Sequence, residues 1–413
     1  MSSSAVVSRS REALFNSDFL DRFGRWPVGF IAAGGAEIGD VVAVAEAVDD
    51  GDESAFYDAF VASGDAKAAD ARALLSKGRR HSARDRFLRA SCMYGAAYHP
   101  IYGAPTDPRL LAAFDTQMSM FHEAMQLGET PVSAVSIPFE GHDMPAYLVP
   151  ATHRPTEVRP LLIVNNGYDA TITDIYFAMG VAALNRGYHV LMFDGPGQGE
   201  MLYRHGIPLR PDWETVISAV IDYAETINIV DADRIALSGW SLGGYFAPRA
   251  ASGEPRLAAC IADPGQWDIS ESVGSFLSAF GVSDQVPPAE LDDAVLDQIM
   301  RHVLDNRIMR WQIVQRGFWA NGVSDLRAYF QSLSEFTIKD RVSEITCPTL
   351  LTSAENDPLA QTTREFFDAL TCPKELLTFT AALDGAGDHC EMGNRSLLNQ
   401  RVLDWLDETL AVQ

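Results

Sequence analysis

The chain has 413 residues, of which 47% are hydrophobic and 21% are charged. This balance is typical of a globular enzyme, and it excludes a disordered or fibrous chain. The formal net charge of -24 repels nucleic-acid phosphates and anionic membrane surfaces, although acidity can also serve solubility alone. A small organic partner therefore fits better than a nucleic acid or a membrane.

The cysteines and histidines point away from disulfides and metal sites. The five cysteines are scattered without a CxxC pair, and an odd number cannot all pair within one chain. No His pair or Cys cluster has the spacing of metal ligands, so we expect neither a metal nor another cofactor. The sequence shows no signal region and no long uncharged apolar stretch, so we expect a cytoplasmic protein.

Residues 1–129 are predicted to form a helical amino-terminal domain. Segments such as DESAFYDAFVASGDAKAADARALLSK place apolar residues three and four positions apart, as amphipathic helices do. No Gly/Ser-rich tether separates this region from the rest of the chain. We therefore expect the domain to pack on the remainder and to close one side of the site that the remainder carries.

Residues 130–413 are predicted to form an α/β domain with a mostly parallel, doubly wound sheet. The domain begins with two alternating runs, VSAVSIPFEG and HDMPAYLVPA, which indicate an antiparallel hairpin. Short β-rich runs then alternate with helical stretches, and most of the runs end in Gly, Asn or Asp. These runs are RPLLIVNNG, YHVLMFDGPG, RIALSGWS, LAACIADPG, CPTLLTSAEND and KELLTFTAAL.

One connection, between Asp263 and Cys347, is far longer than the others. It contains helical patterns such as AELDDAVLDQIMRHVLDN. Insertions of this length without strands are usually lids or binding elements. We predict that residues 266–342 form a helical cap over the carboxyl ends of the strands, where open α/β sheets bind ligands.

The pattern GWSLG, with Ser241 at its centre, carries the strongest chemical signal. It follows the apolar run RIAL and precedes the helical pattern YFAPRAAS, so its context is strand, sharp turn and helix. Such a turn needs small neighbours, because the backbone at the serine is strained. A Gly-rich turn at a helix start is the plain alternative, but it does not explain why suitable partners follow in the order that a triad requires.

Those partners are Asp357, after one predicted strand, and His389, between the last predicted strand and the last helical pattern. The serine needs a base to take its proton, and the base needs a carboxylate to orient it. Glu355, Asp384 and Asp388 are alternatives for the carboxylate. Asp357 is preferred because it falls just past a strand end.

Acyl transfer also needs donors for the developing oxyanion. The N–H of Leu242, after the nucleophile, is predicted to be one donor, and that of Tyr168, after the strand LLIVNN, the other. Packing of the loop is the alternative role for Tyr168. His99, in YHPIYG, stays open as a residue that approaches the substrate from the helical domain.

The run DGPGQG invites a different interpretation, because glycines follow a strand as they do in phosphate-binding loops. Its spacing is not GxGxxG, and no Lys-Ser/Thr pair follows it. We therefore predict a tight turn beside the active site.

The stretches NNGYDAT, FDGPGQGE, GWSLGGYFAPRAA and GDHCEMGNRSLLNQRVLDWL resemble the 2,6-dihydroxypseudooxynicotine hydrolase-like group of α/β-hydrolases. Its relatives include fungal pigment enzymes that shorten polyketide chains and fermentation-respiration switch proteins. The resemblance implies the α/β-hydrolase fold behind a helical domain, and it carries the triad onto Ser241, Asp357 and His389. It also implies cleavage of a carbon-carbon bond beside a ketone as one activity, with Glu271 as the nearest match to an acidic residue that makes the histidine more basic.

We predict a serine hydrolase for a small or medium hydrophobic carbonyl compound, whose scissile bond is an ester, an amide or a carbon-carbon bond beside a ketone. Two alternatives stay open: a hydrolase-like binding protein or receptor with negligible turnover, and a lyase or cyclase acting on a polyketide-like substrate. The expected partner is the substrate, with no nucleic acid and no membrane. Assembly as a homodimer stays open.

Overall fold

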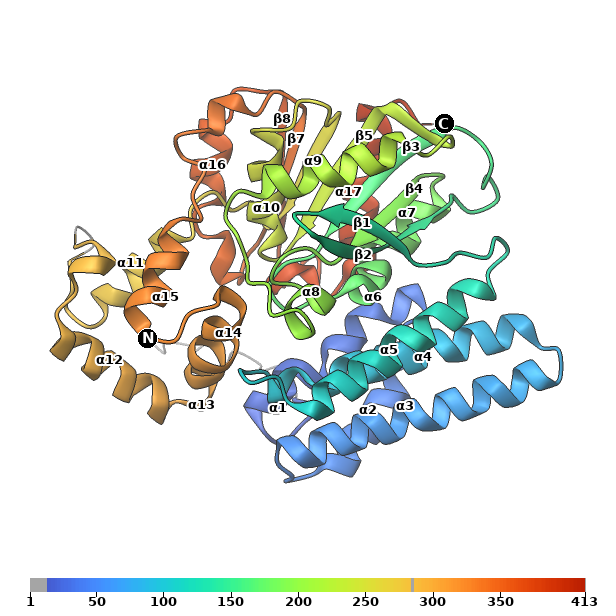
Figure 1. The fold of residues 1–413 in the computed structure, drawn as a ribbon, viewed down its shortest axis with the longest axis horizontal. Coiled ribbons are helices and arrows are strands. Elements are labelled where there is room, and N and C mark those ends of the chain that lie inside the picture. Colours follow the sequence, from blue (N-terminus) through green and yellow to red (C-terminus); the bar gives the residue numbers. More distant parts are fainter. Residues whose placement is uncertain (1–12, 284–285, 413) are drawn as a thin grey trace, which may run out of the picture.

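An eight-stranded sheet lies at the centre of the described part of the chain (Figure 1). The computed structural model describes residues 13–283 and 286–412. The strands lie in the order β1-β2-β4-β3-β5-β6-β7-β8. Their bounds are β1 Val135–Phe139, β2 His142–Val149, β3 Arg159–Asn165, β4 His189–Phe193, β5 Val230–Trp240, β6 Ala259–Asp263, β7 Thr349–Ala354 and β8 Lys374–Phe379.

The sheet begins with an antiparallel hairpin and continues as a parallel array. β1 pairs with β2 and β2 with β4 in antiparallel fashion, whereas every pair from β4 to β8 is parallel. Glu140 and Gly141, in the hairpin turn, have φ angles of 48° and 82°, and two positive φ angles suit the right-handed twist of the strands. The mostly parallel, doubly wound sheet predicted from the sequence is confirmed.

Helices flank both faces of the sheet. α9 and α10 pack against each other and on β5, while α7 packs on β4 and α17 on β6; Figure 1 shows α9 in front of the sheet and α17 behind it. The bounds are α6 Ile172–Ile175, α7 Val181–Asn185, α8 Gly199–Tyr203, α9 Trp213–Glu225, α10 Gly243–Ala251, α16 Thr363–Ala369 and α17 Arg395–Thr409. None of the helices in the described part of the chain combines the length and apolar character that a membrane crossing requires.

The helices that precede the sheet form one group (Figure 1). They are α1 Asp18–Gly24, α2 Ile38–Val48, α3 Glu53–Ser76, α4 Arg80–Ala97 and α5 Pro108–Gln126, with 3-10 helices at Trp26–Ala33 and His99–Ile101. The group packs directly on the core. Phe121 meets Tyr147 and Tyr176 edge-on at 5.1 and 5.2 Å between ring centroids. The buried Gln117 amide donates to the Thr171 hydroxyl at 3.0 Å.

A helical insertion occupies the connection between β6 and β7. Its helices are α11 Ser270–Ser278, α12 Asp293–Asp305, α13 Arg307–Met309, α14 Phe318–Asn321 and α15 Leu326–Ser334, with a π-helical segment at Arg310–Gly317. The insertion encloses an apolar cluster of its own, distinct from the core of the sheet. Figure 1 shows it as a separate orange group beside the sheet.

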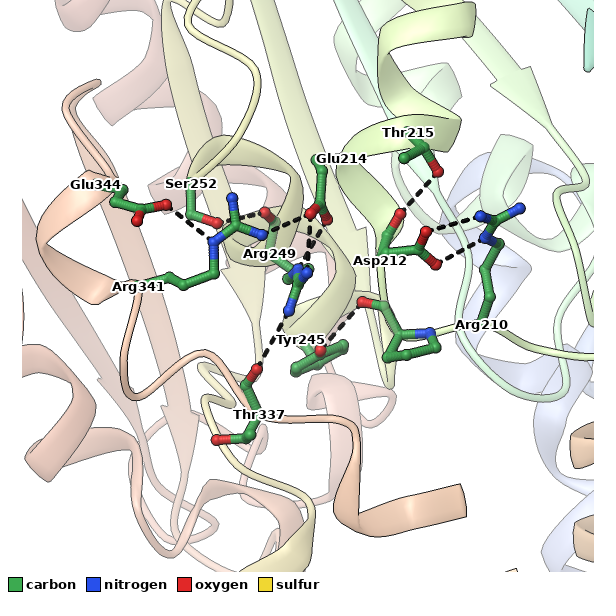
Figure 2. Close-up of polar contacts among 11 residues, drawn as sticks. Arg210, Asp212, Glu214, Thr215, Tyr245, Arg249, Ser252, Thr337, Arg341 and Glu344 are labelled. Carbon is green, nitrogen blue, oxygen red and sulfur yellow. Dashed lines mark hydrogen bonds and ion pairs between the residues drawn. The ribbon is translucent and has the colours of Figure 1, made fainter. Parts of the chain in front are cut away.

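The end of the insertion is tied to two core helices. Glu214 on α9 accepts two hydrogen bonds from Arg249 on α10, at 2.7 and 2.8 Å, and one from Arg341 at 2.5 Å. Figure 2 shows these charged groups converging, with Arg249 also donating to the Thr337 carbonyl. The network fixes the point at which the insertion returns to the sheet.

Candidate active site

Ser241 lies in the sharp turn between β5 and α10. Its φ of 61° places a non-glycine residue in the left-handed region, which costs on the order of 1–3 kcal/mol. Two hydrogen bonds of 2.7 Å hold the turn: the Ser241 N–H donates to the Asp263 carbonyl, and the Gln266 amide donates to the Ser241 carbonyl. A Cβ at Gly239 would lie 1.8 Å from the Gly243 carbonyl oxygen. Only glycine therefore allows the chain to turn this tightly and present the serine at the edge of the sheet.

The imidazole of His389 joins Ser241 to Asp357. Nε2 lies 2.9 Å from Ser241 Oγ, and Nδ1 lies 2.8 Å from Asp357 Oδ2. The Asp357 side chain has no exposed surface, and its other oxygen accepts the Leu359 N–H at 2.9 Å. Because a carboxylate can only accept, Nδ1 carries the proton and Nε2 is free to accept from the serine. The structure thus brings together the three residues that the sequence singled out.

The electrostatic surroundings raise the pKa of His389 above its ordinary value. Burial lowers this pKa, but the hydrogen bond and charge of Asp357, together with the charges of Asp263 and Asp169, raise it by more. Negative charge favours the imidazolium form. The histidine is therefore a stronger base than a free imidazole.

The three alternative carboxylates have other partners. Glu355 accepts a backbone N–H at 2.9 Å and Asp388 accepts one at 3.1 Å, each from the loops beside it. Asp384 pairs with Arg401 at 2.8 Å. All three therefore support loops near the histidine, while Asp357 is the carboxylate whose oxygen lies 2.8 Å from its Nδ1.

Glu271 lies on α11 of the insertion, and its carboxylate pairs with Lys339. The ammonium of Lys339 also lies 3.0 Å from Asp268. The acidic groups with the largest effects on the pKa of His389 are Asp357, Asp263 and Asp169. The modulating role assigned to Glu271 by resemblance stays a prediction.

The two expected oxyanion donors flank the serine. Within residues 13–283 and 286–412, neither the Leu242 N–H nor the Tyr168 N–H donates a hydrogen bond. The two segments approach closely at Gly167, where a Cβ would lie 2.6 Å from the Leu242 nitrogen and 3.0 Å from Ser241 Cβ. Glycine at this position therefore lets the loop after β3 come this close to the turn that carries Ser241.

The segment GPGQG, residues 195–199, lies against the loop that follows β3. Gln198 Nε2 donates to the carbonyl oxygens of Asn166 and Gly167, at 2.9 and 3.0 Å. Asn166 in turn donates to Asp194 at 2.9 Å. The segment therefore braces the loop after β3, as a tight turn beside the site.

Aromatic side chains from the amino-terminal helices lie over the region next to the serine. The Trp26 ring stacks on His99, with centroids 4.9 Å apart, and meets Trp240 edge-on at 5.8 Å. His99 is 1% exposed, and its Nε2 lies 3.3 Å from the Asp169 carbonyl oxygen. The insertion joins this contact, because Trp311 donates to the His99 carbonyl at 2.7 Å. Two segments distant in sequence thus meet beside the triad.

A buried ion pair behind His389 escaped the sequence analysis. Arg395 Nη1 lies 2.7 Å from Asp263 Oδ2, and the same nitrogen donates to the Cys390 carbonyl at 2.7 Å. Glu391 is buried next to the pair, and burial together with the charge of Asp263 raises its pKa well above the ordinary range. The run LAACIADPG predicted that Asp263 lies at the end of a strand. No pattern in the last helix indicated that Arg395 is its partner.

Among the described residues, no group of three His, Cys, Asp or Glu side chains is arranged to hold a metal ion. A cavity of about 430 Å³ lies between the amino-terminal helices and α7, lined by Arg84, Leu88 and Tyr176 among others, and no triad residue lines it.

Known proteins resemble the chain over most of its length. The alpha/beta hydrolase family model matches residues 161–396. The chain is 32% identical to hydrolase acrC of Aspergillus aculeatus, with 92% of this chain and 94% of that protein covered. It is 30% identical to the 20-hydroxy-prefusarin hydrolase of Gibberella moniliformis, with 97% of each covered.

One solved structure is similar to this chain in its fold. The 2,6-dihydroxy-pseudo-oxynicotine hydrolase superposes with a TM-score of 0.72 at 22% identity, covering 93% of this chain and 95% of that one. At this identity the likeness concerns the fold alone. With the sequence matches, it confirms the resemblance and the fold class inferred from the sequence.

Proposed function

The chain belongs to the alpha/beta hydrolase family and is a hydrolase, and we propose that it acts through Ser241 as nucleophile, His389 as base and Asp357 as the carboxylate that orients the base. One observation carries the proposal: hydrogen bonds of 2.8 and 2.9 Å run from Asp357 through His389 to Ser241. A serine hydroxyl is a poor nucleophile at neutral pH, and a base within hydrogen-bond distance activates it.

In the first half of the proposed reaction, His389 Nε2 takes the hydroxyl proton as Ser241 Oγ attacks the substrate carbonyl carbon. The carbonyl electron pair moves onto its oxygen, and the Leu242 and Tyr168 N–H groups donate to the resulting oxyanion. When the oxyanion collapses, the scissile bond breaks and the leaving group takes the proton from His389. An alkoxide, an amine nitrogen or a ketone-stabilised carbanion can each accept that proton.

In the second half, water replaces the leaving group. His389 takes a proton from the water as its oxygen attacks the acyl carbon, and the same two N–H groups stabilise the second oxyanion. Collapse releases the carboxylic acid and returns the proton to Ser241 Oγ. Asp357 keeps Nδ1 protonated throughout, so Nε2 alone accepts and returns the transferred proton.

We propose a hydrophobic carbonyl compound as the substrate. The Trp26 ring meets that of Trp240, the residue before Ser241, with centroids 5.8 Å apart, and aromatic side chains near the serine suit an apolar ligand held at one polar point. One relative bears the name 20-hydroxy-prefusarin hydrolase, which favours an organic compound as the substrate of this chain. The candidate scissile bonds are an ester, an amide and a carbon-carbon bond beside a ketone.

The test is a panel of p-nitrophenyl esters, anilides and β-diketones, incubated with the protein and with Ser241→Ala, and analysed by product mass. We expect one class to turn over, and Ser241→Ala to lower kcat by roughly 10⁴ to 10⁶ while the fold stays intact. Ser252→Ala, at the far end of α10, is the matched control and should keep its activity. Activity of Ser241→Ala within about tenfold of the parent would refute the assignment.

A further inference from the structure

The loop that follows β3 is held from two different sides. Its first half is held by the core, because Gln198 donates to the carbonyl oxygens of Asn166 and Gly167. Its second half, Tyr168 and Asp169, is held from outside the core. The change of support falls at the Tyr168 N–H, one of the two proposed oxyanion donors.

Arg316 of the insertion forms an ion pair with this second half. Its Nη1 lies 2.8 Å from Asp169 Oδ2, and the two side chains are 19% and 15% exposed. The guanidinium carbon lies 4.3 Å from the ring centroid of Tyr168 and 5.1 Å from that of Trp311. Arg316 is thus held between two aromatic faces while it pairs with the residue next to the donor.

Other contacts make the second half of the loop depend on its neighbours. Asn321 of the insertion donates to the Tyr168 hydroxyl and, at 2.9 Å, to the Gly317 carbonyl. Tyr102, from the amino-terminal helices, donates to the Asp169 carbonyl at 3.1 Å. The position of the Tyr168 backbone therefore follows the seating of the insertion as well as the end of β3.

We propose that Arg316 is a positioning residue for the oxyanion hole: its guanidinium, seated on Tyr168 and Asp169, aligns the Tyr168 N–H with that of Leu242. This inference rests on the proposed serine-hydrolase function, and it makes turnover depend on where the insertion sits. The oxyanion forms only as the carbonyl is attacked. A misaligned donor therefore reduces the stabilisation of the transition state more than it reduces the binding of the substrate. Loss of Arg316 therefore lowers kcat more than it raises KM.

The contacts of Arg316 also predict a difference between two substitutions. A planar guanidinium stacks on aromatic rings and pairs with a carboxylate at the same time, whereas an ammonium supplies the charge without the stacking plane. Arg316→Lys should therefore recover part of the kcat that Arg316→Met loses.

Arg307→Met is the matched control. Arg307 lies on the same insertion, pairs with Glu53 at 2.5 Å and covers the Phe19 ring at 4.4 Å. It makes the same kinds of contact as Arg316, but to the amino-terminal helices instead of the oxyanion loop. Its side chain is more exposed than that of Arg316, 38% against 19%, so its loss loosens the contact between the insertion and the amino-terminal helices without touching the donor.

The experiment measures kcat and KM on the best substrate, and the affinity of an aryl boronic acid that forms a tetrahedral adduct on the serine. Deletion of an oxyanion donor costs about 10²- to 10³-fold in kcat, so a displaced donor in Arg316→Met should cost about 10- to 100-fold, with KM changed less than about threefold. Boronic acid affinity should fall in parallel with kcat. Arg307→Met should keep both within about threefold of the parent.

Three results would overturn the inference: unchanged kcat in Arg316→Met, a rise in KM alone, or a loss of kcat equal to that of Arg307→Met. If Arg316→Met fails to fold, Arg316→Lys carries the same comparison. Ser241→Ala is measured in parallel. Activity retained in Ser241→Ala refutes the serine-hydrolase function itself, whereas activity lost there but kept in Arg316→Met refutes only the positioning role.

Discussion

Two parts of the candidate site are built in different ways, and we call them the floor and the roof. The floor consists of Ser241, Asp357 and His389 with the turns that carry them. The roof consists of the 3-10 helix Trp26–Ala33, His99 and the insertion segment Arg310–Gly317. Strand ends and backbone hydrogen bonds hold the floor, whereas side chains from segments far apart in sequence hold the roof. The sheet therefore fixes Ser241, Asp357 and His389, while side-chain packing holds the segments of the roof together.

The largest effect is expected from a substitution in the floor that leaves the roof unchanged. Asp357→Asn should lower kcat by about 10⁴-fold, because the amide can donate to Nδ1 and leave Nε2 protonated, which is the wrong tautomer for a base. The thermal midpoint should change little by comparison. Kinetics and thermal unfolding are measured together, with Asp388→Asn, a neighbouring loop carboxylate, as the control. A loss smaller than about tenfold would show that Asp357 does not orient the base.

A smaller effect is expected when the roof loses a side chain and the floor stays unchanged. Trp26→Ala removes the ring that contacts His99 and Trp240. We expect kcat/KM for a bulky aromatic or long acyl substrate to fall about 10- to 100-fold, and that for an acetyl ester to fall less than about threefold. Equal losses for both substrates would mean that Trp26 acts on the floor instead of on the substrate space.

The smallest expected effect is a shift in pH dependence. His389 must be neutral to accept the serine proton, so kcat/KM rises with pH through the pKa of this residue, and the raised pKa places that rise above the value of about 6.5 for a free imidazole. Asp263→Asn removes a negative charge that favours the imidazolium, so the rise should move to lower pH. Asp384→Asn, which removes a charge paired with Arg401, should leave it in place. A shift to higher pH in Asp263→Asn would contradict the electrostatic argument.

The floor could be predicted from the sequence because sheet topology determines it. Each of its residues follows a short apolar run, and the carboxyl ends of parallel strands meet at one edge, so the order serine, aspartate, histidine was enough to place Ser241, Asp357 and His389 near one another. The choice of Leu242 and Tyr168 as oxyanion donors rests on the same argument and stays a prediction. Asp263 also lies at a strand end, but its neighbours were not apparent before the fold was known.

The roof could not be predicted in the same way. Arg316 lies in a helical pattern in which an arginine is usually a solvated side chain, and Trp26 lies where an aromatic residue usually packs in a core. Their contacts depend on how the insertion and the amino-terminal helices dock on each other. Periodicity reports the burial of one element, but not the partner that buries it. Resemblance pointed to Glu271, yet the structure pairs that residue with Lys339.

The central claim is that His389 activates Ser241, and reaction with a fluorophosphonate followed by peptide mass spectrometry tests it most directly. Cys390 is the other nucleophilic side chain beside the histidine, because its sulfur lies 3.4 Å from His389 Nε2. Burial, however, raises the pKa of its thiol well above the ordinary value. We predict one adduct per chain, located on Ser241, and labelling slowed by at least about 100-fold in His389→Ala. An adduct on Cys390 or elsewhere, the absence of any adduct, or an unchanged labelling rate in His389→Ala would contradict the claim.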